Sequence, residues 1–319
     1  MLRPALGDRT RSDEFAHRIP AMTATTPGQA LAREAVLDVP TPLGLEGIEF
    51  IEYTTPRAQA LGQLLEQVGF RPVARHRSRE VLLYRQGDMN IVINAHGQPP
   101  AAEGAVAAAP QIAAMALRVR DAGAAHRRVV DLGAWPVPVK VQPMELHIPG
   151  VHGVGQSRVY FVDRWREFSI YDVDFVPIPT VASQVPPLAG MRWFGVVQYV
   201  GLERASDWCE FYGSLFGFTV LPAEQTFGIL PAGNILRSPC GTFYLQLIEP
   251  ASDSEDFTSA EHLQRVAFGT PDVPAAVRAL RDRGVDFVEA SALHSTARGA
   301  LTREQLGGVM FELVHHHHG

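Results

Sequence analysis

Hydrophobic and polar residues alternate over residues 47–53 with the two-residue period of a β-strand. A helix is predicted next, because four apolar residues have the spacing of one buried helix face: Leu61, Leu64, Leu65 and Val68. Gly69 follows as a helix stop signal. Further strand-like runs cover 73–76, 81–85 and 90–94, with the turn Gln86-Gly87-Asp88 before the last. This order predicts a βαβββ unit.

The same order of elements returns along the chain. A second unit is predicted from a strand at 113–119, a helix at 122–132 closed by Gly133, and strands near 139–141, 158–162 and 169–175. After a Pro-rich connector the pattern repeats with strands at 194–200 and 266–268 and helices at 205–215 and 274–283. Gly217 follows Gly69 by 148 residues and Asp272 follows Asp121 by 151, so the spacing indicates a duplicated domain.

The repeat predicts an α+β fold of tandem βαβββ units, with two similar domains that each form an open curved β-sheet with flanking helices. We expect a flexible tail at 1–43, an amino-terminal domain at 44–178, a Pro-rich linker at 179–190 and a carboxy-terminal domain at 191–315. Polar side chains from several strands converge inside such a cup-shaped sheet, so a ligand site is expected there.

Composition narrows the class of partner. The net charge of −6 comes from 28 basic and 34 acidic residues without long blocks of one sign, which argues against binding to nucleic acid. No run approaches the ~18 apolar residues of a membrane span, and the start of the chain lacks a secretory pattern, so a cytoplasmic location is expected. Cys209 and Cys240 lack metal-binding spacing and are interpreted as reduced thiols. A small molecule is the expected partner.

Several segments carry a family resemblance, and they span some 130 residues: 47–53, 69–79, 83–90, 143–146, 153–155, 160–164 and 169–175. They resemble the amino-terminal domain of bacterial 4-hydroxyphenylpyruvate dioxygenases, which belong to the vicinal oxygen chelate (glyoxalase/bleomycin resistance) superfamily. The resemblance implies a structural amino-terminal domain and a carboxy-terminal domain that bears the site. It also favours a homo-oligomer.

The resemblance implies an iron site whose ligands this chain does not retain. In the family, two histidines and one glutamate from three strands bind ferrous iron and leave positions open for a 2-oxoacid and dioxygen. The matching positions here are Gly195, Arg265 and Glu312. Glycine has no ligand atom and a guanidinium only donates hydrogen bonds, so Glu312 is the one remaining metal ligand. No cofactor is expected, unless the family activity is retained with Fe(II).

Other interpretations of these residues remain open. Arg265 and Glu312 form an ion pair in the space of the metal, or Arg265 binds a ligand carboxylate with Glu312 as a general base. Gln198 and Gln246 are further candidates for substrate binding in the cup. His262 lies three residues before Arg265, an offset that predicts the opposite strand face.

Two further sets of residues are interpreted as non-functional. Glu49, Ala114 and Asp172 take the corresponding positions of the first half, where the methyl group of alanine argues against a metal. The run 315–318 consists of four histidines and would take up nickel or zinc whatever the protein does.

Three functional hypotheses follow. The first is a divergent relative of 4-hydroxyphenylpyruvate dioxygenase with weak or absent iron-dependent activity. The second is a metal-free protein of the same fold that binds a small aromatic or carboxylate ligand. The third is a lyase or isomerase that uses Glu312 as its general base.

Overall fold

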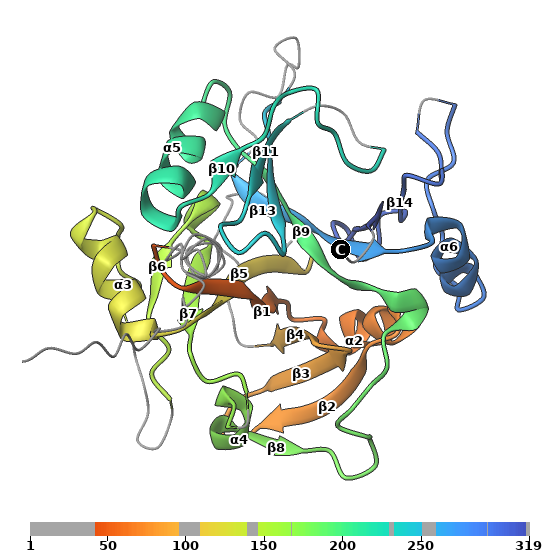
Figure 1. Ribbon diagram of the computed structural model, residues 1–319. Helices are drawn as coiled ribbons and strands as arrows, with labels where there is room; N and C mark the ends of the chain where they lie inside the picture. Colours follow the sequence, from red (N-terminus) through yellow and green to blue (C-terminus); the bar gives the residue numbers. More distant parts are fainter. Residues whose placement is uncertain are drawn as a thin grey trace, which may run out of the picture. The chain divides into compact units, whose positions relative to one another are not determined.

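The computed structural model describes residues 42–95, 109–138, 146–166, 168–229, 233–250, 260–291 and 293–316. Most of the predicted tail and the predicted strand at 139–141 lie outside these residues. Both halves of the described chain follow the predicted order of strands and helices (Figure 1).

The first half contains two successive units. The first unit comprises β1 (Leu45–Thr54), α2 (Ala58–Val68), β2 (Arg71–His76), β3 (Val81–Gln86) and β4 (Met89–Asn94). The second comprises β5 (Gln111–Val119), α3 (Ala122–Asp131), β6 (Gly150–His152), β7 (Arg158–Val162), α4 (Ile170–Asp174) and β8 (Phe175–Pro177). A short 3-10 turn at Val154–Gln156 precedes β7.

The second half repeats this series after a 3-10 turn at Leu188–Gly190. Its first unit comprises β9 (Arg192–Tyr199), α5 (Ala205–Phe216), β10 (Thr219–Val220), β11 (Asn234–Arg237) and β12 (Tyr244–Ile248). Its second comprises β13 (His262–Thr270), α6 (Val273–Arg281), β14 (Gly299–Leu301) and β15 (Phe311–His315).

The hydrogen-bonded ladders confirm the duplication. In the first half, β1 pairs with β4 in parallel and with β5 antiparallel, and β5 pairs with β7 in parallel. In the second half, β9 has the same relation to β12 and β13, and β13 to β15. The two halves join where Leu263 of β13 pairs with Ile112 of β5, so the described strands form one continuous sheet. The α+β fold is confirmed, whereas the domain boundaries stay a prediction.

The helices α3, α5 and α6 begin and end within two residues of their predicted bounds. Gly69 and Gly217 end α2 and α5 with positive φ angles of 107° and 78°, which glycine adopts without strain. At the start of α3 and of α6, an aspartate carboxylate accepts a hydrogen bond from the backbone N–H three residues later, at 2.8 Å for both Asp121 and Asp272. The helices pack their apolar faces on the sheet, and α3 and α5 contact each other (Figure 1).

The predicted strand at 169–175 is wrong. Residues Ile170–Asp174 form the one-turn helix α4, and only Phe175–Pro177 are extended. The Asp172 carboxylate accepts hydrogen bonds from the Ser169 backbone N–H at 2.7 Å and from its hydroxyl at 2.9 Å, and this local capping stabilises a helical turn over a strand. Asp172 is therefore not on a strand equivalent to that of Glu312.

None of the described helices is long and apolar enough to cross a membrane.

Asp272→Ala is expected to lower the free energy of unfolding by about 1 kcal/mol, because the first turn of α6 loses its side-chain acceptor. Chemical denaturation measures the change. Asp282→Ala at the other end of α6 is the control, since no helix N–H depends on that carboxylate, and an equal loss there would contradict the capping role.

Candidate functional site

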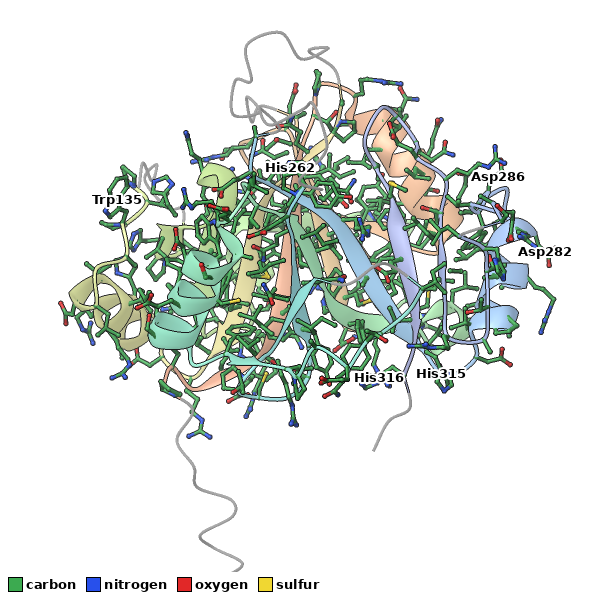
Figure 2. All side chains as sticks on the ribbon, turned by 90° about the horizontal axis from the view of Figure 1, so that it is seen from above. Trp135, His262, Asp282, Asp286, His315 and His316 are labelled. Carbon is green, nitrogen blue, oxygen red and sulfur yellow. The ribbon has the colours of Figure 1, made fainter. Side chains whose placement is uncertain are left out.

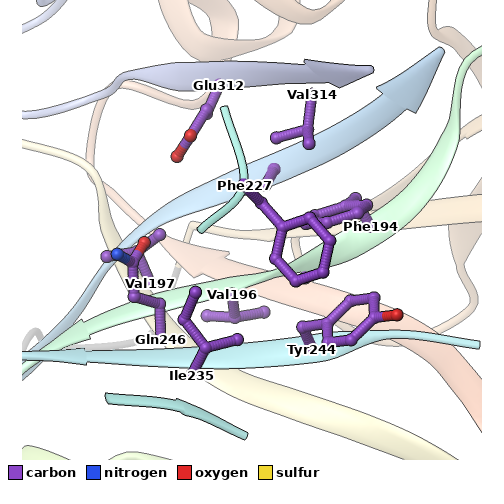
Figure 3. A pocket seen from close by; sticks show the side chains of 11 residues that line it. Phe194, Val196, Val197, Phe227, Ile235, Tyr244, Gln246, Glu312 and Val314 are labelled. Carbon is purple, nitrogen blue, oxygen red and sulfur yellow. The ribbon is translucent and has the colours of Figure 1, made fainter. Parts of the chain in front are cut away.

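Three strands bring the predicted ligand positions together. Ala267 of β13 pairs with Gly195 of β9 on one side and with Glu312 of β15 on the other. Arg265 lies two residues before Ala267 on β13, and its side chain reaches Glu312. The structure thus assembles Gly195, Arg265 and Glu312 in one place. Gly195 and Glu312 line the cup of the second half, and Figure 3 shows the Glu312 side chain there.

A bulge in β13 determines which residues face this cup. The β9–β13 register shifts between Leu263 and Arg265, so these two residues pair with the adjacent residues Gln198 and Val197 of β9. Leu263 consequently packs in the core while Arg265 faces the cup.

The bulge also corrects the prediction for His262. It pairs with Tyr199, whose hydroxyl accepts from Arg265 Nη1 at 3.5 Å, so His262 shares the face of Arg265 instead of lying opposite. Its ring is exposed, its Nδ1 lies 2.7 Å from the Ala260 carbonyl oxygen, and it packs edge-on against Tyr199.

The expected ion pair between Arg265 and Glu312 is present. Arg265 Nε lies 3.4 Å from Glu312 Oε2, and the two side chains are 3% and 4% exposed. Arg265 Nη1 also donates to Gln264 Oε1 at 3.0 Å. Burial raises the pKa of Glu312 from its usual 4.5 to about 7, while the nearby guanidinium acts in the opposite direction. A pKa near 7 means that the protonated and ionised forms of the carboxyl group are both populated at neutral pH.

Aromatic rings fill the other end of the cup. The rings of Phe194, Phe227 and Tyr244 pack against one another with centroid distances of 4.7 to 5.2 Å (Figure 3). The space left among the lining residues is about 20 Å³, room for roughly one water molecule. Gln246 also lines the cup, as predicted.

Gln198 lies elsewhere. Its side chain is fully buried on the opposite face of β9, where its Oε1 accepts a hydrogen bond from the Tyr212 hydroxyl of α5 at 2.9 Å. The alternation of side chains along a strand explains this, because its neighbours Val197 and Tyr199 face the cup side. Gln198 thus does not line the cup.

Sequence reasoning missed the aromatic residues of the cup. Phe227 comes from the segment between β10 and β11, where a single phenylalanine follows a polar stretch without strand or helix period. Phe194 and Tyr244 lie on strands whose apolar patterns read as ordinary core. The only available signal was the isolated aromatic residue in a loop.

The donor set in the cup does not fit the iron site implied by the family. A side chain at position 195 would start 2.2 Å from the Tyr244 carbonyl oxygen, so the present backbone has no room for an imidazole there. The guanidinium of Arg265 repels a cation, and Glu312 alone supplies a carboxylate.

The described histidines of the second half do not gather in the cup. Figure 2 shows His262 at one end of β13, while His315 and His316 lie toward the other end, beside Thr270. Within the described residues no three His, Cys, Asp or Glu side chains are grouped so that they could hold a metal ion.

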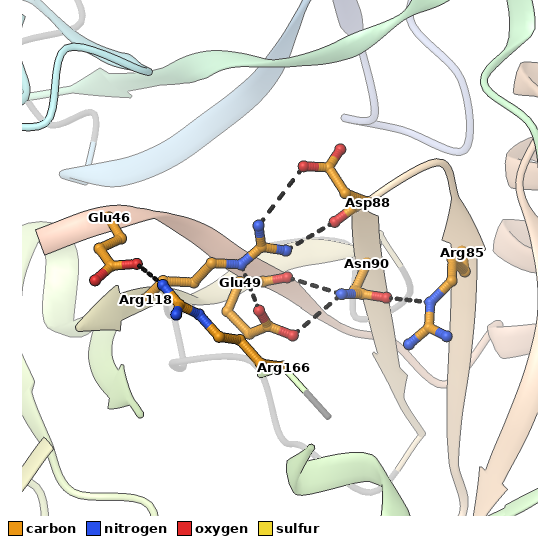
Figure 4. Close-up of polar contacts among 7 residues, drawn as sticks. All are labelled: Glu46, Glu49, Arg85, Asp88, Asn90, Arg118 and Arg166. Atoms are coloured by element: carbon orange, nitrogen blue, oxygen red, sulfur yellow. Dashed lines mark hydrogen bonds and ion pairs between the residues drawn. The ribbon is translucent and has the colours of Figure 1, made fainter. Parts of the chain in front are cut away.

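The first half has its own buried polar network (Figure 4). Glu49 accepts from Arg118 Nε at 2.6 Å and from Asn90 Nδ2 at 3.2 Å, and Asn90 Oδ1 accepts from Arg85 Nε at 2.8 Å. Arg118 also contacts Asp88. The charge of Glu49 is thus satisfied within the protein, which agrees with a structural interpretation of this half.

Comparison with known proteins supports the fold. The family profile "Hydroxyphenylpyruvate dioxygenase, HPPD, N-terminal" matches residues 39–176, and the profile of the "Glyoxalase/Bleomycin resistance protein/Dioxygenase superfamily" matches residues 200–313. The chain therefore has the fold of the vicinal oxygen chelate superfamily.

Individual relatives identify the family within this superfamily. A 4-hydroxyphenylpyruvate dioxygenase of Pseudomonas sp. (strain P.J. 874) is 34% identical over 260 residues, which cover 78% of this chain and 72% of that protein. Hemolysin VllY of Vibrio vulnificus is 35% identical over 266 residues, which cover 79% and 74%. The chain belongs to the 4-hydroxyphenylpyruvate dioxygenase family.

A solved structure adds a longer relative. A xylose isomerase-like TIM barrel/4-hydroxyphenylpyruvate dioxygenase fusion protein superposes with a TM-score of 0.68 at 25% identity. The match covers 91% of this chain and 54% of the fusion protein, so this chain spans about half of its length.

Gly195→Ala is expected to lower the free energy of unfolding by about 1–3 kcal/mol, because the added methyl group collides with the β12 backbone. Gly213→Ala is the control. It lies within α5 with its nearest neighbour at 3.6 Å, and should raise stability by about 0.5–1 kcal/mol. A stable Gly195→Ala variant in urea denaturation would contradict the close approach.

The raised pKa of Glu312 predicts a pH dependence of stability. The unfolded chain releases the Glu312 proton near pH 4.5, whereas the folded chain retains it up to about pH 7. The contribution of this proton to the free energy of unfolding is therefore full below pH 4.5 and is lost as the pH rises through about 7. The loss amounts to at most about 3 kcal/mol. Glu312→Gln should remove this dependence, as measured by denaturation at pH 5 and pH 8. If the native protein and Glu312→Gln lose the same stability between pH 5 and pH 8, the assignment of this pH dependence to Glu312 is refuted.

Proposed function

We propose that this chain is a metal-independent member of the family that binds a small aromatic carboxylate in its carboxy-terminal cup and has weak or no iron-dependent dioxygenase activity. The observation that carries the proposal is the buried Arg265–Glu312 pair at the position where the family resemblance expects iron ligands. A guanidinium there excludes a cation and favours an anion.

Arg265 has bonding capacity left for a ligand. Its Nε faces Glu312 and its Nη1 faces Gln264 and Tyr199, whereas Nη2 has no acceptor among the described residues. A carboxylate at Nη2 would make a charge-assisted contact, and the contact becomes two-pronged if the carboxylate also replaces the Tyr199 hydroxyl, which lies 3.5 Å from Nη1. Since Glu312 is partly protonated near pH 7, the positive charge of Arg265 is incompletely balanced and attracts such a group.

The opposite end of the cup suits an aromatic ring. Phe194 and Tyr244 line it with their rings, and Gln246 adds a polar side chain toward the other end (Figure 3). A ligand with a planar ring at one end and a carboxylate at the other matches this distribution of polar and apolar groups.

A second candidate function is that of a lyase or isomerase with Glu312 as general base. The observation in its favour is the pKa of Glu312, which is raised to about 7 and so lies near the usual operating pH of a proton-transfer group. Such an enzyme would use the same Arg265 contact to position its substrate. A homo-oligomeric state and a cytoplasmic location remain further predictions.

Titration calorimetry with 4-hydroxyphenylpyruvate and with phenylpyruvate tests the binding function. The native protein should bind without added metal, and Arg265→Met should weaken binding at least tenfold, because a charged hydrogen bond is worth about 1.5–3 kcal/mol. Arg278→Met on the exposed side of α6 is the matched control. Equal binding by both variants would refute the role of Arg265.

Metal analysis tests the loss of iron. Native protein and Glu312→Gln are loaded with ferrous iron under the same conditions, so that uptake by the terminal histidines is common to both. Equal iron contents are expected. Stoichiometric iron that Glu312→Gln loses, together with turnover of 4-hydroxyphenylpyruvate, would overturn the proposal.

A further inference from the structure

One segment of the chain already fills the aromatic end of the cup. Residues 221–229, here named the strap, run between β10 and β11. Residues 222–226 are exposed, Phe227 is half-buried and Gly228 is buried. The strap therefore crosses the surface and turns inward at one aromatic residue.

The Phe227 ring is packed by aromatic neighbours. Its centroid lies 4.7 Å from that of Tyr244 and 5.2 Å from that of Phe194, and these three residues form a small apolar cluster with Ala267 and Val314. Figure 3 shows the ring projecting between the strands into the cup. The space that a ligand ring would need is thus taken by the protein itself.

The strap also covers the polar end. Gly228 has a φ of 64°, and a Cβ built on it would lie 2.5 Å from Glu312 Oε1. It also approaches Gly299 of β14 so closely that a Cβ on Gly299 would meet the Gly228 Cα at 2.7 Å. Only glycines allow this contact, which shields the carboxyl group of Glu312 from solvent.

Within the described part of the chain, few hydrogen bonds connect the strap to its surroundings. Leu221 N–H donates to the Ile235 carbonyl at 2.8 Å where the strap begins. Further along, exposed Arg298 Nη2 donates to the Thr226 carbonyl at 3.2 Å and to its hydroxyl at 3.0 Å. Because most of the strap is exposed and so few hydrogen bonds tie it to the rest of the described chain, it opens at lower free energy than the sheet beneath it.

From this arrangement we propose that Phe227 is a built-in occupant of the aromatic end of the cup, and that a ligand binds by displacing it together with the strap. The inference rests on the proposed binding function. It assigns to Phe227 the control of ligand access to the cup and of the apparent affinity. When the binding-competent state is only a minor population, the apparent affinity is reduced by that fraction. Removing the internal competitor should therefore strengthen binding.

Phe227→Ala tests this directly, with phenylpyruvate as the probe in titration calorimetry. The variant should bind at least tenfold more tightly than the native protein. If Phe227 were an ordinary wall of the site, its truncation would remove contacts and weaken binding instead. Phe211→Ala, which truncates a partly buried ring of α5 outside the cup, is the control and should leave affinity unchanged.

A second variant opens the strap without altering the cup lining. Arg298→Ala removes the contacts to Thr226 and should strengthen binding several-fold, even if Phe227→Ala fails to fold. Weaker or unchanged binding by Phe227→Ala, or by Arg298→Ala where Phe227→Ala does not fold, overturns the inference.

A neutral probe separates this inference from the proposed function. Phenol has a ring but no carboxylate, and should bind Phe227→Ala and not the native protein. If phenol binds in this way while no acid binds either protein, the strap is supported and the carboxylate function fails. If the native protein binds acids through Arg265 but Phe227→Ala binds them less tightly, the function stands and the strap fails.

Discussion

The arrangement of the carboxy-terminal half depends on one electrostatic constraint, which is that the positive charge of the buried Arg265 guanidinium must be balanced. Withdrawing a charge from water costs several kcal/mol, and only well-placed acceptors offset that cost. Arg265 finds them in Glu312, Gln264 and Tyr199, which come from three strands. Because both members of the pair are almost fully buried, removal of either alone would leave the other without its counter-charge. The strands of the cup are therefore linked through this pair as well as through their ladders.

The two halves share one pattern of strand pairing but carry different polar side chains on it. In the first half, Glu49, Arg118 and Asn90 form a network whose charges are satisfied within the protein. In the second half the corresponding sheet carries a pair with spare donors, a carboxyl group that titrates near neutrality and a cluster of rings. The duplicated halves thus share one scaffold, and the side chains on their concave faces differ in charge balance and in aromatic content.

The sequence predicted most of the helices and strands because their signals are local. Gly69, Gly217, Asp121 and Asp272 mark helix ends through backbone conformation and capping, which depend on few neighbours. The segment 169–175 was misassigned because an apolar alternation outweighed the capping by Asp172.

The site was harder to predict because it depends on tertiary register. The conjunction of Arg265 with Glu312 followed from the family resemblance. Gln198 faces away from the cup, and this could be recognised only from the pairing of the strands. The same holds for the face on which His262 lies, because the bulge interrupts the alternation of side chains along β13. Phe227 lies in a loop whose path no periodicity describes, so its place in the cup could be found only from the structure.

The irregularity of β13 has an evolutionary consequence. In a regular strand, residues 263 and 265 would point to the same side, yet here one packs in the core and the other faces the cup. Deletion of Gln264 would restore strict alternation and leave Leu263 in the core and Arg265 in the cup, because the bulge already absorbs one extra residue. The bulge thus lets β13 lose one residue without any change in which of its side chains face the cup.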